Sequence, residues 1–206
     1  GTGDLEILLS GSLGKPVAHI RASTEHRYAW TDTMSPQPGR GRIAATLRDN
    51  RLLIDQAYIV SSAGSLSATG AYDLGTKRVD LDAVGSGVDL HVLNPDLTGI
   101  GRFKGTVAGV LDRLRYQGTA ELFGLRIRNQ AIPVVAAVIQ GDSKSVTADN
   151  LRAVKGAGQA TGSVNLRYRD MAMDGRFAAK GIQLSDFLGE KYLASIDLDN
   201  ARLGGT

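Results

Sequence analysis

The sequence of 206 residues contains no cysteine, which excludes disulfide bridges and thiolate metal sites. It has only three histidines, His19, His26 and His91, and none of them has a second histidine at the short spacing typical of paired metal ligands. We therefore expect no metal site built on histidine. Each of the three is expected to lie on the surface or at a rim.

Long apolar runs are also missing. No stretch of about 18 consecutive apolar residues occurs, so no membrane-spanning helix is predicted. Leu5–Leu9 is too short for a signal peptide and follows an acidic residue, so none is expected here. Aromatic residues make up 5% of the chain, which argues against a transmembrane barrel with its aromatic girdles.

Charge of one sign is not in large excess. Lys and Arg total 24 and Asp and Glu total 21, which gives a formal net charge of +3. No basic stretch is interleaved with aromatic residues that could stack on bases. The charge pattern therefore predicts no nucleic-acid partner.

Motifs for catalysis or cofactors are absent as well. Gly156, Gly158 and Gly162 superficially match a dinucleotide-binding loop, but the last spacing is one residue too long and strands follow. No serine lies in a Gly-x-Ser-x-Gly nucleophile elbow. We expect no enzymatic activity and no cofactor.

Two acidic pairs, Asp80 with Asp82 and Asp197 with Asp199, have a spacing of two residues. This spacing places both carboxylates of a pair on one face of a strand, where they could bind Ca²⁺ or lie on a solvated outer face. The solvated face is the preferred interpretation.

What the sequence does contain is glycine, 26 residues in all, and apolar residues that alternate with polar ones. The alternation is clearest over 160–180, where two amphipathic arms flank a polar corner at 168–170. Because side chains of a strand point alternately to opposite faces, this pattern predicts a long hairpin with one apolar face.

The pattern recurs along the chain and predicts an all-β fold, an elongated curved antiparallel sheet of degenerate hairpin repeats over a single segment, 1–206. Breaks in the alternation predict a loop over 34–42, a bulge near Gln56 or Ala57, and a helical turn over 185–188. Val88, Leu90 and Val92 are predicted to form a strand.

Five glycines are predicted in mid-strand on the apolar side, where glycine costs packing and about 0.5 to 1 kcal/mol relative to alanine. Their repetition favours a crease that folds the sheet into a trough; the alternative is a β-sandwich whose two layers approach closely. These glycines are Gly70, Gly105, Gly118, Gly162 and Gly175.

Three copies of one unit can be aligned, with starts at 68–72, 103–107 and 160–164. Each passes a charged corner and returns to a similar tetrapeptide that begins with glycine, at 87–90, 124–127 or 181–184. Hairpins stacked in this way imply a sheet that grows along one axis.

The segments 64–74 and 158–166 resemble the Gly- and Leu-containing strands of the TamB and AsmA-like family, and 10–16 is similar to its Gly-x-Leu-x-x-Pro link. The resemblance implies a half-open β-taco with no catalytic residues. It implies a fragment of a longer inner-membrane-anchored protein that crosses the periplasm of a diderm bacterium. It also implies transport of phospholipid to the outer membrane, with an outer-membrane TamA-type barrel as a possible partner of the family.

In this interpretation the apolar sides of the strands line a groove for phospholipid acyl chains. Two alternatives stay open: an assembly module that pairs an edge strand with outer-membrane proteins, and a closed sandwich with a structural or carbohydrate-binding role. The predicted lining residues are Leu66, Tyr72, Leu74, Val79, Leu81, Phe103, Val107, Leu114, Tyr116, Leu122, Val164, Leu166, Met171, Met173 and Phe177.

Overall fold

The computed structural model describes residues 1–28, 37–92, 97–127, 130–170, 172–183 and 195–205, which form thirteen β-strands and one turn of 3-10 helix. The elements are β1 Thr2–Ser12, β2 Lys15–Tyr28, β3 Gln37–Arg48, β4 Arg51–Ser61, β5 Gly64–Asp73, β6 Arg78–Asp89, η1 Leu90–Val92, β7 Leu97–Val110, β8 Arg113–Ile127, β9 Gln130–Asp142, β10 Ser145–Lys155, β11 Gly158–Arg167, β12 Met173–Gln183 and β13 Ser195–Gly205.

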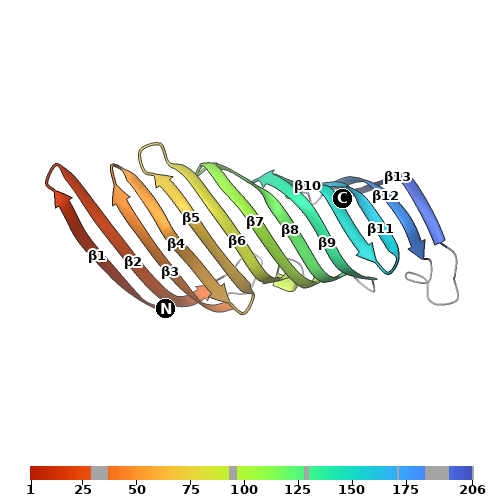
Figure 1. The fold of residues 1–206 in the computed structure, drawn as a ribbon, viewed down its shortest axis with the longest axis horizontal. Helices are drawn as coiled ribbons and strands as arrows, with labels where there is room; N and C mark the ends of the chain where they lie inside the picture. The colour runs from red at the N-terminus through yellow and green to blue at the C-terminus, as the bar shows by residue number, and fades with distance from the viewer. Residues whose placement is uncertain (29–36, 93–96, 128–129, 171, 184–194, 206) are drawn as a thin grey trace.

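All thirteen strands belong to one sheet in which each strand pairs antiparallel with the next in sequence (Figure 1). The strands are 10 to 15 residues long, above the usual length of 5 to 6 residues. Turns from odd to even strands lie at the upper end of the sheet in Figure 1, and the described turns from β4 to β5 (62–63) and from β10 to β11 (156–157) lie at the lower end. The predicted elongated antiparallel sheet is confirmed.

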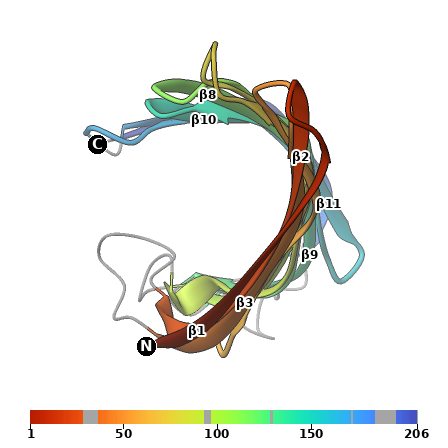
Figure 2. The same ribbon diagram turned by 90° about the vertical axis from the view of Figure 1, so that its left-hand side faces the viewer.

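The sheet is strongly curved. Seen along its long axis, it bends into a C with an open side (Figure 2). Apart from contacts between β7 and η1, each strand makes extensive contacts only with its neighbours in sequence. The described residues contain no second sheet, so the sandwich alternative is not observed in this part of the chain.

The predicted hairpin over 160–180 is present as β11 and β12. Leu166 is opposite Met173, and Gly162 is opposite Phe177. Opposite residues of an antiparallel pair share a face. The alternation therefore predicted both the pairing and the apolar side of this hairpin.

A row of small residues crosses the middle of the sheet: Ala57, Ala68, Ala83, Gly105 and Gly118 are successive partners on β4 to β8. Backbones approach closely here, because a Cβ added to Gly105 would lie 2.7 Å from the Gly118 Cα and collide with the Gln117 carbonyl oxygen. Small side chains thus let the strands bend without steric conflict on this face.

Bulges interrupt the ladder at regular places. In β4, Ala44 pairs with Gln56 but Ala45 pairs with Ile54, so Asp55 is the extra residue and the predicted bulge is confirmed.

The repeated glycines of the aligned tetrapeptides also lie at shifts of register. Gly87, Gly124 and Gly181 have φ angles of 63°, 60° and 62°. Asn150, with φ of 50°, occupies the corresponding place in β10. Asn tolerates this left-handed conformation, so the repeat continues in a strand where no glycine marks it.

Two predictions of secondary structure are wrong. Residues 37–42, predicted as part of a loop, belong to β3, where Pro38 pairs with Arg27 near the start of the strand and Gly41 pairs with Thr24. Proline is compatible with a strand near its first residue, so the high Pro and Gly content was misleading. Met34–Pro36 and the helical turn predicted over 185–188 lie outside the described residues.

The second error concerns Leu90–Val92, which form η1 and do not continue the strand from Val88. The Asp89 Oδ1 accepts a hydrogen bond from the His91 backbone N–H at 3.0 Å, which stabilises the turn. Leu90 thereby becomes buried, with 4% of its surface exposed.

Candidate functional site

The register assembles one apolar face from nearly all strands. Thirteen of the fifteen predicted lining residues lie on this face. Each of them is either opposite another member of the face on the neighbouring strand or two positions from another member on its own strand. These are Leu66, Tyr72, Val79, Leu81, Phe103, Val107, Leu114, Tyr116, Leu122, Val164, Leu166, Met173 and Phe177.

The two remaining residues are not placed on this face. Leu74 lies in the turn that follows β5, where its N–H donates to the Asn50 carbonyl at 2.9 Å. Met171 lies outside the described residues.

The apolar face extends further than predicted, across β1 to β4. Leu9, Ala18, Leu47 and Leu52 are successive partners that lead to Tyr72. The alternation in these strands was visible in the sequence, but their residues were not included in the predicted lining. The additional members include Leu5, Ile7, Leu9, Ile20, Ile43, Leu47, Leu52, Ile54 and Ile59.

This apolar face is the concave one. Leu90 of η1 packs against Leu125 and Val135 of the face, and η1 lies on the inner side of the C in Figure 2. The cluster is joined by partly buried apolar residues, namely Leu97, Leu122, Ile132, Leu151 and Ala153. It closes only a small part of the face near the lower end of β6 to β10.

Elsewhere the apolar face has no covering layer among the described elements. The buried apolar residues are mostly alanine, and no described side chain larger than leucine is buried. On β1, Ile7 is 53% exposed and Leu9 is 78% exposed. Since burial of such a side chain contributes about 1.5 to 3 kcal/mol, this surface can gain free energy by binding apolar chains.

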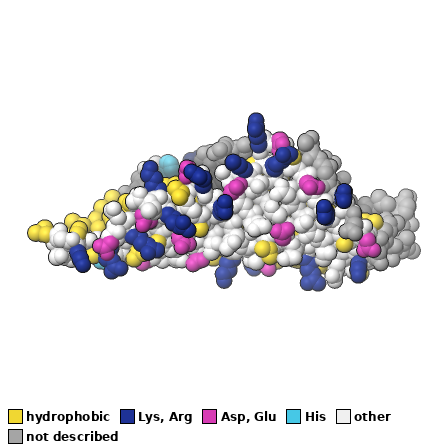
Figure 3. All heavy atoms as spheres, turned by 90° about the horizontal axis from the view of Figure 1, so that it is seen from above, with side chains coloured by type: hydrophobic (Ala, Val, Ile, Leu, Met, Phe, Trp, Pro, Cys, Tyr) yellow, Lys and Arg dark blue, Asp and Glu magenta, His cyan; other side chains and the backbone are white. Residues whose placement is uncertain are grey.

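The opposite face is polar and carries charges of both signs. Arg40 Nε lies 2.9 Å from Glu25 Oε1, and Asn165 Nδ2 donates to Thr147 Oγ1 at 2.9 Å. In Figure 3, Lys, Arg, Asp and Glu side chains are spread over the convex surface, and hydrophobic side chains gather at the end formed by β1 and β2. The sheet therefore has one solvated face and one apolar face.

A pair of tyrosines connects distant strands on the concave side. The ring of Tyr116 in β8 lies across Gly141 of β9, and its hydroxyl hydrogen-bonds the Tyr168 hydroxyl in the turn after β11. Burial, together with this hydrogen bond, raises the pKa of the Tyr116 hydroxyl above its ordinary value. The contact ties four successive strands together near the upper end of the sheet.

Within the described residues, no group of three or more His, Asp or Glu side chains is arranged to hold a metal ion. Asp80 and Asp82 lie exposed on the polar face, as the preferred interpretation predicted, and His19, His26 and His91 are exposed. The described part of the chain also contains no helix with the length and apolar character needed to cross a bilayer.

Comparison with known proteins adds no relative: family models, curated proteins and solved structures all gave no match to this chain.

Proposed function

We propose that this chain is a segment of an inner-membrane-anchored periplasmic protein that carries phospholipids toward the outer membrane along the concave face of the sheet. One observation carries the proposal: a continuous apolar face runs across the strands, and the described chain leaves most of it uncovered. The likeness of 64–74 and 158–166 to TamB and AsmA-like strands supports the cellular setting.

The physical basis is the hydrophobic effect. An uncovered apolar face is costly in water, and acyl chains that lie on it remove both their own surface and that of the protein from solvent. Apolar contacts are non-directional, so an acyl chain can occupy equivalent positions on successive strands. With neighbouring strands about 4.8 Å apart, the thirteen strands span about 58 Å.

Met173 and Phe177 show how the lining could adapt. Met173 is 39% exposed on the apolar face and its unbranched side chain accommodates chains of differing shape. Phe177 packs over Gly162: a Cβ added to Gly162 would lie only 2.8 Å from a ring carbon of Phe177. Both side chains belong to one hairpin, which makes it the place to test the face.

The test is native mass spectrometry of the purified chain, combined with lipid transfer between vesicles. We expect bound phospholipid in the unchanged protein and its loss in Val164→Arg or Phe177→Glu, which place a charge on the apolar face. Ser163→Arg and Ala178→Glu are matched controls, because they place the same charges on the polar face of the same two strands. Normal lipid binding and transfer by the Val164 and Phe177 variants, with an intact fold, would refute the proposal.

A second candidate function is assembly of outer-membrane proteins, alongside a TamA-type barrel, by strand pairing. It is favoured by β1, which pairs only with β2 and leaves its other edge free within the described sheet. Leu8 on its polar face is 54% exposed, in addition to the apolar residues of its concave face. An exposed hydrophobic edge strand is a template for an incoming strand.

A further inference from the structure

The turns at the upper end of the sheet share a feature that the apolar face does not explain. Each of the six contains or directly adjoins an exposed basic side chain, and the turns recur every second strand, about 9.6 Å apart. One cation from each turn, in chain order, gives the series Lys15, Arg51, Lys77, Arg113, Lys144 and Arg169.

The carboxylates of these turns are engaged in holding the turns themselves. Asp73 Oδ1 accepts the Thr76 N–H at 2.7 Å, and Asp142 Oδ1 accepts the Lys144 N–H at 2.8 Å. Asp170 accepts the Ala172 N–H at 3.2 Å and pairs with Arg167 at 3.1 Å. These acids therefore have a structural role, and they neutralise only part of the basic charge.

Four of the six cations are less engaged, whereas Arg113 of the series lies 3.8 Å from Asp112. Lys15, Lys77, Lys144 and Arg169 take part in none of the salt bridges between described residues. The six turns, each with two flanking residues on either side, contain nine basic and six acidic side chains, a net charge of +3. They span 11–16, 47–52, 72–79, 109–114, 141–146 and 166–174.

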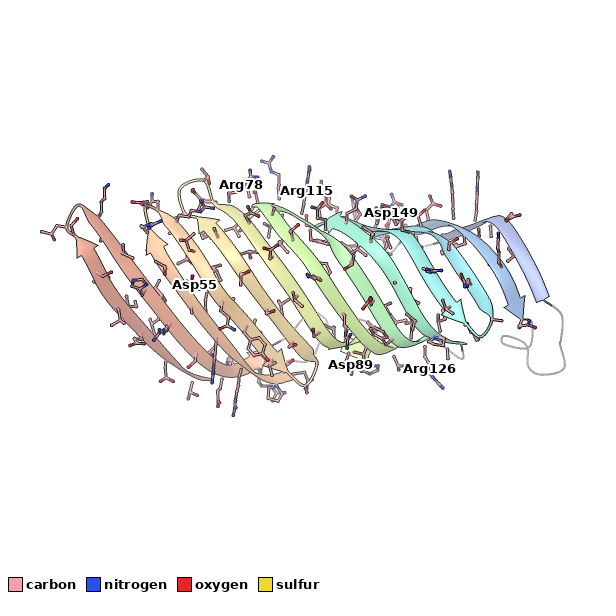
Figure 4. The ribbon with its side chains drawn as sticks, viewed as in Figure 1. Asp55, Arg78, Asp89, Arg115, Arg126 and Asp149 are labelled. Atoms are coloured by element: carbon pink, nitrogen blue, oxygen red, sulfur yellow. The ribbon has the colours of Figure 1, made fainter. Side chains whose placement is uncertain are left out.

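The lower end is described at two hairpin turns. Its two described hairpin turns, 62–63 and 156–157, contain no charged residue, and Lys155 adjoins the second. Figure 4 shows Arg115 at the upper end of β8, outside the ranges counted above, and it also shows Asp149 toward the upper end of β10 and Arg126 at the lower end of β8. The upper turns thus carry a net charge equal to that of the whole chain, +3, and the charges of the remaining residues balance.

We propose that this row of upper turns, here called the basic rim, binds the phosphate groups of anionic phospholipids whose acyl chains lie on the apolar face. The inference rests on the proposed function and adds a headgroup class and an orientation to it. A phosphodiester that carries no cation of its own gains most from the rim, whereas the choline group of a zwitterionic lipid cancels the attraction. Headgroups are thus directed to one edge of the trough.

The experiment compares binding of fluorescent phosphatidylglycerol and phosphatidylcholine with identical acyl chains to the whole chain. We expect phosphatidylglycerol to bind about five to ten times more tightly at low ionic strength, with a smaller ratio at high salt because salt screens exposed charges. The rim variant reverses Lys15, Lys77, Lys144 and Arg169 to Glu. The control variant reverses four exposed cations of the polar face to Glu, namely Arg42, Lys104, Arg176 and Lys180.

The rim variant should bind phosphatidylcholine as the unchanged protein does and lose the preference for phosphatidylglycerol, while the control variant keeps it. Equal binding of both lipids by the unchanged protein, or a preference that survives in the rim variant, would overturn the basic rim and leave the apolar face intact. Binding of neither lipid would overturn the proposed function itself. The net charge change is the same in both variants, so a general charge effect would abolish the preference in both and also count against the rim.

Discussion

At the scale of single residues, the backbones of β7 and β8 approach closely at Gly105 and Gly118, which are opposite each other. Their Cα atoms leave no room for a methyl group on either strand. The absence of side chains at this point is therefore a steric requirement of the curved sheet.

Gly105→Ala tests this requirement. We expect the free energy of unfolding to fall by about 2 to 3 kcal/mol, since the added methyl collides with backbone atoms that cannot rotate away. Gly14→Ala is the control, because nothing lies within 4 Å of its Cβ position, and it should change stability by less than about 0.5 kcal/mol. Denaturant unfolding measures both. Equal stability of the two variants would show that the strands are farther apart in solution.

The Tyr116–Tyr168 contact gives a prediction about pH. The folded-state pKa of the Tyr116 hydroxyl is raised, first by burial and then by the Tyr168 hydroxyl. Its contribution to stability is therefore complete below about pH 10, the ordinary pKa of tyrosine, and is lost as pH rises toward the folded-state pKa.

Tyr168→Phe should lower the pKa of Tyr116 toward its ordinary value and cost about 1 kcal/mol at neutral pH, the usual net value of one hydrogen bond. Ultraviolet titration of tyrosinate follows the first effect and thermal unfolding follows the second. Tyr58→Phe is the control, because Tyr58 and Tyr168 are equally exposed, at 39%. An unchanged titration curve for Tyr168→Phe would contradict the assignment.

At the scale of elements, the even strands β6, β8, β10 and β12 repeat one device. Each contains a residue with positive φ at a shift of register, and that residue is followed by an apolar one. A bulge of this kind adds a residue, bends the strand and increases its twist. Repetition in successive even strands bends the sheet in the same sense along its length.

The edge strand β1 gives the element-scale prediction. Its exposed apolar residues and free edge favour association at high concentration, so Ile7→Lys should reduce self-association measured by sedimentation velocity. Leu111→Lys is the matched control: Leu111 is also 53% exposed, but it lies in a turn, where no strand can pair. A similar decrease in both variants would indicate general hydrophobic association and would argue against edge pairing.

At the scale of the whole molecule, the thirteen strands form a nearly one-dimensional array, since each strand relies on the two beside it. In such arrays stability depends on neighbouring interfaces, and the ends are weaker than the middle. β1 illustrates this, because every one of its residues is exposed.

We therefore expect amide hydrogen exchange to be fastest in β1 and to slow toward β7 and β8, where the ladders are long and paired on both sides. Hydrogen exchange with mass spectrometry resolves these segments. Equal protection from β1 to β8 would mean that the sheet opens only as a single cooperative unit.

The sequence alone determined which residues share a face. Alternation in 160–167 and 173–180 specified the apolar side of that hairpin, because the side-chain period of a strand is a local property. Repeated glycines indicated where strands bend, although Asn150 and Pro38 show that residue type is an incomplete guide to conformation.

Only the tertiary structure decided what happens to the apolar side. The same amphipathic strands could cover one another in a sandwich or stay uncovered in an open trough, and that choice depends on contacts between residues far apart in sequence. The small residues along β4 to β8 and the repeated bulges bend the sheet into a C, and η1 covers only its lower part. Likewise, six separate turns become one basic rim only because in-order pairing of the strands brings their upper ends into line.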